Sequence, residues 1–172
     1  DKTYKVDKCG GLYEGGLRNF KVSWSSDSKW LAYSKDLNNR GGAIFIYNVQ
    51  EEKPFQVTSG FYTDTEPTFD PDGKYLYFTT NRTFNPIYSD LDNTWIYPNS
   101  TNIALVTLSE DVVSPLMPKN DTTTVKKDET KKDDKSTKKD DDKTKKDEKE
   151  KSKDIKITLD NFENRVEILP VA

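Results

Sequence analysis

The sequence predicts an all-β fold: about two four-stranded antiparallel blades of a β-propeller, with a disordered charged insertion. Three observations lead to this prediction. The chain contains an internal repeat with an offset of 45 residues, it shows no sustained helical period of apolar residues, and its charge is concentrated in one segment, 126–154. A repeat of roughly 40 to 50 residues built from short strands has the period of a propeller blade.

The repeat aligns Phe20–Ser34 with Thr65–Thr79. Aromatic and apolar positions match throughout: Trp24 with Phe69, Trp30 with Tyr75, Leu31 with Leu76 and Tyr33 with Phe78. In each copy a first strand ends at an aromatic residue and a polar tetrad follows, with Pro and Gly at turn positions in the second copy. The repeat therefore predicts the same strand and turn twice.

Further strands follow from aromatic and β-branched runs. In the first unit we expect strands at Trp30–Ser34, Ala43–Val49 and Phe55–Thr58. In the second unit we expect Tyr75–Thr80, Asn102–Leu108 and, beyond the charged segment, Ile155–Leu159 as the fourth strand. At the two ends, Tyr4–Asp7 and Arg165–Pro170 resemble strands of a preceding and a following unit.

These strands divide the chain into five parts. They are the end of a preceding blade with a linker (1–19), a first blade (20–60), a second blade (61–118 plus 155–160) with an aromatic insertion (81–101), a disordered Lys/Asp-rich loop (119–154), and the start of a following blade (161–172). Closed propellers typically have four to eight blades, so we expect the chain to be a fragment of a larger protein.

Composition excludes several classes of function. The chain has 27 basic and 30 acidic residues and a net charge of -3, so we expect no nucleic-acid partner. It has no apolar run long enough to cross a bilayer, so we expect no membrane partner. It has no histidine and one cysteine, Cys9, which exclude Ser-His-Asp and Cys-His catalysis and a cysteine zinc cluster. We therefore predict no catalytic, metal-binding or cofactor-binding residue and no cofactor.

Two further segments are candidate sites: an acidic turn and the aromatic insertion. Asp70–Gly73 resembles part of a calcium loop but lacks the later ligands of an EF-hand.

The aromatic insertion (81–101) is rich in side chains that supply contact area at low entropic cost. A surface that contacts substrate or another subunit is one interpretation. Packing on its own blades or on a neighbouring domain is the favoured one. The candidate contact residues are Phe84, Tyr88, Trp95 and Tyr97.

The segment 126–154 contains 13 lysines, 11 acidic residues and no apolar residue. Without apolar side chains it cannot offset chain entropy by burial, so we favour a solvated loop over a tether that binds charged partners. Loop closure becomes only slowly less favourable with length, so a blade can tolerate such an insertion.

The repeat also resembles known families. Trp24–Tyr33 resembles the repeat of TolB-like and tricorn-type propellers. The second unit is similar to the propeller region of tricorn-protease-like serine peptidases, at Val57–Pro67, Leu76–Arg82, Asn85–Asp90, Trp95–Asn99 and Ile157–Val166.

The resemblance implies a large peptidase whose propellers admit or filter peptide substrates and whose catalytic residues lie in a separate region. No position here matches those residues, so this segment is expected to be non-catalytic. The implied partners are the remaining propeller and peptidase domains of the parent, peptide substrates and, through the parent, a possible homo-oligomer.

Two alternatives stay open: a TolB-like binding or scaffold propeller without peptidase activity, and the propeller of a prolyl-oligopeptidase-type hydrolase. The resemblance implies a cytoplasmic location, with a periplasmic or exported location as the alternative.

Overall fold

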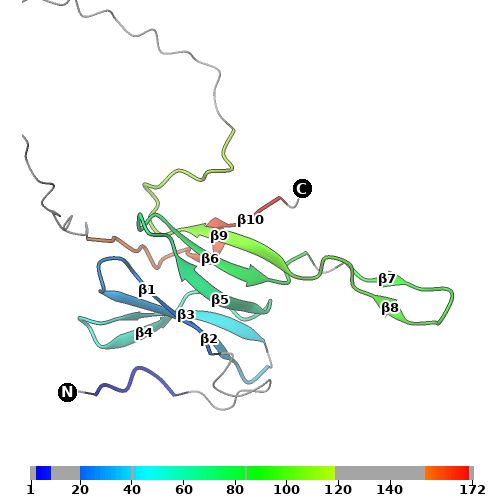
Figure 1. The fold of residues 1–172 in the computed structure, drawn as a ribbon, viewed down its shortest axis with the longest axis horizontal. Coiled ribbons are helices and arrows are strands. Elements are labelled where there is room, and N and C mark those ends of the chain that lie inside the picture. The colour runs from blue at the N-terminus through cyan, green and yellow to red at the C-terminus, as the bar shows by residue number, and fades with distance from the viewer. Residues whose placement is uncertain (1–2, 9–19, 40, 84, 119–153, 171–172) are drawn as a thin grey trace, which may run out of the picture. The chain divides into compact units, whose positions relative to one another are not determined.

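The computed structural model describes residues 3–8, 20–39, 41–83, 85–118 and 154–170. The chain divides into two units, and the first of them comprises Asp1–Leu116 with Ser152–Ala172. All described strands belong to the first unit (Figure 1). Helix among the described residues is limited to a 3-10 turn, Glu163–Arg165. Within the same residues, no helix has the length and apolar character to span a bilayer.

The first sheet has four antiparallel strands in the order β1-β2-β3-β4. The strands are β1 (Val22–Trp24), β2 (Trp30–Asp36), β3 (Gly42–Asn48) and β4 (Lys53–Gln56). Every residue of β3 is buried, because its alternating side chains pack against apolar groups on both faces of the sheet. All four strands were expected, with ends that differ by no more than two residues.

The second sheet is also four-stranded and antiparallel, in the order β10-β9-β6-β5. Its strands are β5 (Asp64–Phe69), β6 (Tyr75–Thr80), β9 (Asn102–Thr107) and β10 (Val166–Ile168). A separate two-stranded hairpin, β7 (Ile87–Tyr88) and β8 (Trp95–Ile96), lies between β6 and β9 in the chain. The predicted all-β architecture of two four-stranded blades is confirmed.

The turn between the first two strands is the same in both sheets. Two backbone hydrogen bonds of 2.9–3.0 Å close each turn: Ser25 N to Trp30 O and Ser28 N to Ser25 O, then Asp70 N to Tyr75 O and Gly73 N to Asp70 O. The fourth turn residue has a positive φ in both, 59° at Ser28 and 68° at Gly73. Glycine adopts this conformation without steric cost, whereas serine does not. The 45-residue repeat is thus a repeat of backbone geometry.

The two sheets pack on each other through different faces, so residues at equivalent positions of the repeat do not all lie in the shared core. Leu76 and Phe78 of the second sheet share one buried core with Ala32 and Ile44 of the first. The repeat partners of Leu76 and Phe78 are Leu31 and Tyr33, which point to the opposite face of the first sheet, away from this core. The first sheet therefore offers one face to the second sheet, and its other face, with Leu31 and Tyr33, is directed away from the second sheet.

Residues 3–8 lie on that opposite face of the first sheet. Val6 packs against the cluster that contains Leu31 and Tyr33. Asp7 accepts hydrogen bonds from the Tyr33 hydroxyl (2.7 Å) and the Lys35 ammonium (2.8 Å). Burial raises the pKa of Asp7, but these bonds outweigh it and hold the pKa below its ordinary value. Tyr4–Asp7 was predicted as a strand, which is wrong: on the face of a sheet there are no free backbone groups to pair with.

The fourth strand of the second sheet is β10, and the prediction that Ile155–Leu159 fills this place is wrong. Apolar and polar residues alternate in this segment because every second side chain is directed to the core, against which Ile155, Ile157 and Leu159 pack. Thr158 N–H donates one bond to Leu108 O (2.8 Å), just past β9. The chain then reverses through the 3-10 turn and runs antiparallel to β9. Residues 161–172 were expected to start a following blade, but Val166–Ile168 in this range forms the last strand of the second one.

Candidate contact surface

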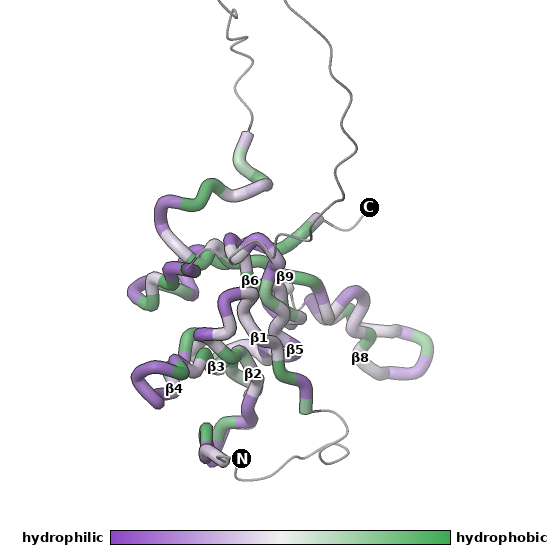
Figure 2. The backbone as a smooth tube through the Cα atoms, turned by 60° about the vertical axis from the view of Figure 1, so that its left-hand side comes forward, coloured by the Kyte–Doolittle hydropathy of each residue, from purple (hydrophilic) through white to green (hydrophobic). Residues whose placement is uncertain are grey.

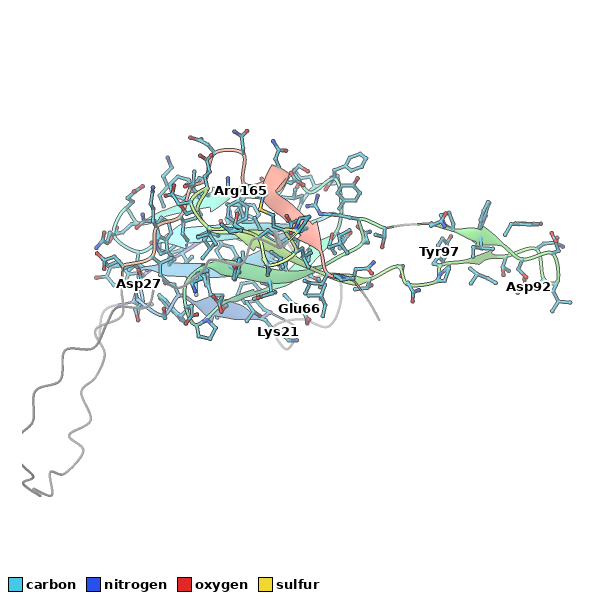
Figure 3. All side chains as sticks on the ribbon, turned by 90° about the horizontal axis from the view of Figure 1, so that it is seen from above. Lys21, Asp27, Glu66, Asp92, Tyr97 and Arg165 are labelled. Atoms are coloured by element: carbon cyan, nitrogen blue, oxygen red, sulfur yellow. The ribbon has the colours of Figure 1, made fainter. Side chains whose placement is uncertain are left out.

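The aromatic insertion forms a hairpin, here called the arm (residues 85–98), that extends away from the two sheets (Figures 1 and 3). Its strands pair Ile87 with Ile96 and Tyr88 with Trp95. The labelled residues Asp92 and Tyr97 lie on the arm in Figure 3. Of the four predicted contact residues, Tyr88, Trp95 and Tyr97 are on the arm, and Phe84 is outside the described residues.

Both faces of the arm are apolar. Directly paired residues share a face and neighbours along a strand alternate, so Tyr88 and Trp95 form one face and Ile87 and Ile96 the other. The two aromatic rings meet edge to face, with centroids 5.5 Å apart. The apolar side chains are about half exposed or more: Ile87 52%, Tyr88 49%, Leu91 97%, Trp95 57%, Ile96 51% and Tyr97 50%. Figure 2 shows hydrophobic and hydrophilic positions interleaved along the arm.

The tip of the arm is held by polar contacts. Ser89 N–H donates to Thr94 O (2.9 Å), and Asn93 turns the chain with a φ of 55°. The Tyr88 hydroxyl donates to Asn93 Oδ1 (2.8 Å), which fixes the aromatic ring to the turn. Hydrogen bonds from the Ser89 and Thr94 side chains lower the pKa of Asp92, so its carboxylate remains charged at neutral pH.

A cavity of about 450 Å³ lies where the arm leaves the second sheet. Its walls include the Thr65, Thr79 and Thr101 side chains and Tyr97, and none of its lining residues is charged. The Thr65 and Thr79 hydroxyls already bond each other at 2.7 Å. The cavity therefore suits neutral hydrogen-bonding groups.

Asp64, Arg82 and Glu163 form an ionic cluster. Asp64 is fully buried, and its carboxylate accepts hydrogen bonds from the Thr80 hydroxyl (2.6 Å) and from Arg82 Nη2 (2.8 Å). Arg82 Nη2 also contacts Glu163 Oε1 (2.9 Å). Glu163 in turn accepts from the backbone N–H and the hydroxyl of Ser59. The cluster thus ties the connection between the sheets to the segment that precedes β10.

Sequence reasoning missed this cluster. Asp64, Arg82 and Glu163 lie far apart in the chain, and each stands in a polar stretch of ordinary composition. One signal was present: Asp64 falls at an inward position of a strand, where an unpaired carboxylate would be costly to bury. Such a position requires a cationic partner, but only the fold shows that the partner is Arg82.

The other acidic candidates have protein partners. Asp70 accepts a bond from the backbone of Lys74, and Asp72 pairs with the Lys74 ammonium. Within the described ranges, no three side chains of the types that ligate metals come together. Cys9 lies outside those ranges.

Comparisons with known proteins agree on one family. Residues 15–172 match the family model described as the tricorn protease second beta propeller domain. The tricorn protease of Thermoplasma volcanium is 30% identical over 108 residues, which are 59% of this chain and 10% of that protein. A putative tricorn-like protease C-terminal subunit of Sulfurisphaera tokodaii is 29% identical over 107 residues, 62% of this chain and 12% of that protein.

The fold agrees as well. The crystal structure of the tricorn protease superimposes with a TM-score of 0.62 at 18% identity, covering 96% of this chain and 14% of that one. The chain thus spans about a tenth of the length of these relatives.

Proposed function

We propose, from the premise that this chain belongs to the family of tricorn protease second β-propeller domains, that it is a non-catalytic scaffold segment of a tricorn-like serine peptidase. In this proposal the parent protein degrades peptides, and the segment helps to shape the passage that admits them. The relatives are named as proteases, which supports a protease as the parent.

The observation that carries the scaffold role is the unequal burial of repeat partners. Phe69, at the end of β5, is 6% exposed because the second sheet packs on the first. Its partner Trp24, at the end of β1, is 54% exposed. An indole at a position that is buried in the next copy of the repeat indicates a face built to be covered.

The cavity beside Thr101 supports the same interpretation. Strand registers make Gly42 the counterpart of Thr101. A Cβ on Gly42 would lie 3.1 Å from Asp64 O and 3.2 Å from Thr65 Cγ2, so the second sheet fills that place on the first. We infer that a neighbouring unit of the parent fills the cavity on the second sheet.

The non-catalytic role rests on the chemistry of the side chains. The sequence contains no histidine to act as a general base beside a serine. Among the described residues, Asp64, Arg82 and Glu163 form ion pairs with one another, so these charged side chains have a structural role.

The test compares the isolated chain with its parent. Incubated with fluorogenic peptides, the 172-residue chain should give no hydrolysis, whereas the parent should cleave them. In the parent, Trp24→Ala should weaken the contact between the first sheet and the unit that covers its Trp24 face, and should speed cleavage of a long unfolded polypeptide relative to a short peptide. Turnover by the purified chain would refute the non-catalytic role, and an unchanged ratio of the two rates would refute the role in substrate admission.

A further inference from the structure

We propose that residues 110–116, here called the strap, bind a polar turn of the sheet that comes after the second one in the parent protein, here called the following sheet. The turn is the one between the first two strands, the counterpart of Asp70–Gly73. The proposal rests on the proposed function, because the parent supplies the following sheet. It names the segment through which the contact is made and the kind of turn that fits it.

The strap lies on the face of the second sheet that is directed away from the first. Leu76 points into the core shared with the first sheet, so its neighbour Tyr75 points to the opposite face. The strand registers place Glu167 of β10 on that face too. The Tyr75 hydroxyl donates to Val113 O (2.9 Å), and the Ser114 hydroxyl donates to the Glu167 carboxylate. These two contacts hold the strap across the sheet from β6 to β10.

The first sheet carries a segment in the equivalent place. Tyr75 is the repeat partner of Trp30, whose Nε1 donates to Ile155 O (3.3 Å). On both sheets the aromatic residue that opens the second strand thus binds a backbone carbonyl of a segment outside the sheet. Ile155 fills the space between Trp30 and the turn of the second sheet, since a Cβ added at Gly73 would lie 2.5 Å from Ile155 Cγ1. Val113 is the counterpart of Ile155 in this arrangement.

The two segments differ in what covers them. Ile155 packs against the core between the sheets, whereas Val113 is 65% exposed and Leu116 is 39% exposed. The sheet beside the strap is open as well: Ile103 is 54% exposed, and Ile44, at the same register position of the first sheet, is fully buried. The second sheet covers these positions on the first. Continuity of the repeat therefore indicates that the following sheet covers them on the second.

A turn that ends in glycine suits the strap. Ile155 leaves no room for a side chain at Gly73, so the turn packed on this kind of segment needs a fourth residue without a Cβ. Ser28 carries a side chain at that position of the first turn. We therefore expect the turn of the following sheet to resemble Asp70–Gly73 and not Ser25–Ser28.

Thiol accessibility in the parent and in the 172-residue chain tests the proposal, because Cys9 is the single cysteine of the chain. In a Cys9→Ser background, Val113→Cys places a probe on the strap and Thr101→Cys places one in the cavity on the same face. We expect maleimide to label the Val113→Cys variant at least about tenfold more slowly in the parent than in the isolated chain, because access limits the reaction. Mass spectrometry of the labelled peptide measures the rate, and circular dichroism verifies the fold of the variants.

The matched control is Gln50→Cys, an exposed position in the connection between the third and fourth strands of the first sheet. Its labelling rate should be similar in the parent and in the isolated chain. Equal slowing at Gln50→Cys and Val113→Cys would mean general shielding and would overturn the proposal.

Unchanged labelling of the Val113→Cys variant in the parent would also overturn it. If the Thr101→Cys variant were protected at the same time, a neighbouring unit would cover this face without the strap, and the proposed function would stand. A benzophenone attached to the Val113→Cys thiol identifies the partner. We expect photocrosslinks to the first turn of the following sheet within the same parent molecule, and crosslinks to another domain or to a second copy would contradict the proposal.

Discussion

At the scale of single residues, the least replaceable contact is that between Asp64 and Arg82. The Asp64 side chain is fully buried, and the Arg82 side chain is 13% exposed. Arg82 also stacks its guanidinium over the Tyr62 ring at 4.7 Å. Because the carboxylate has no access to water, its charge is stabilised by Arg82 and by the Thr80 hydroxyl.

Arg82→Ala should therefore destabilise the fold strongly, by about 3–5 kcal/mol, because it leaves a buried carboxylate without its cation. Urea unfolding followed by circular dichroism measures the change. The matched control is Lys21→Ala, which removes the exposed pair with Glu66 and should cost about 1 kcal/mol or less. Equal losses from both substitutions would show that the cluster is not a structural ion pair.

At the scale of elements, the repeated turn contains a local conflict. Ser28 adopts the positive φ that its counterpart Gly73 adopts freely. At Gly73 a side chain would also collide with Ile155, whose Cγ1 lies 2.5 Å from an added Cβ. The two copies of the turn are thus alike in backbone but opposite in their tolerance of a side chain.

Exchanging the residues between the turns should have opposite effects. Ser28→Gly should stabilise the protein by up to about 1 kcal/mol, because it removes left-handed strain from a non-glycine residue. Gly73→Ser should destabilise it by about 2 kcal/mol or more through strain and overpacking against Ile155. Thermal melts of both variants provide the measurement, and a change of the same sign in both would contradict the turn geometry.

The strands that sequence could predict are those that repeat. The offset of 45 residues located β1, β2, β5 and β6, because aromatic spacing and turn residues carry that information locally. Ile155–Leu159 was misassigned because alternation shows which side chains are buried and not which backbone groups pair. The Asp64–Arg82–Glu163 cluster was unpredictable for a related reason, since its members come from three separate segments.

At the scale of the whole molecule, the chain returns to both sheets after residue 153. Asp27 accepts a hydrogen bond from Ile155 N–H (2.8 Å), and Trp30 Nε1 donates to Ile155 O (3.3 Å). Asp154, predicted as part of the disordered loop, is paired with Lys29 at 2.7 Å. The residues predicted as a loop are otherwise outside the described ranges.

Replacing residues 119–153 by a short Gly/Ser linker should change the melting temperature by only a few degrees, because loop-closure entropy depends weakly on loop length. The control replaces Ile155, Ile157 and Leu159 by serine, which removes three side chains from the core and should lower the melting temperature far more. Loss of cooperative unfolding in the linker variant would show that the charged segment stabilises the fold.

The contact between Asp27 and Ile155 joins residues 128 positions apart, and this has a consequence for how the protein forms. Contacts at such separation are slow to form in folding. During synthesis the first sheet is complete once β4 has emerged, whereas the second must wait for β10. Until β10 has been made, the backbone groups on the outer edge of β9 therefore lack the strand that pairs with them, and an unpaired strand edge favours association between chains.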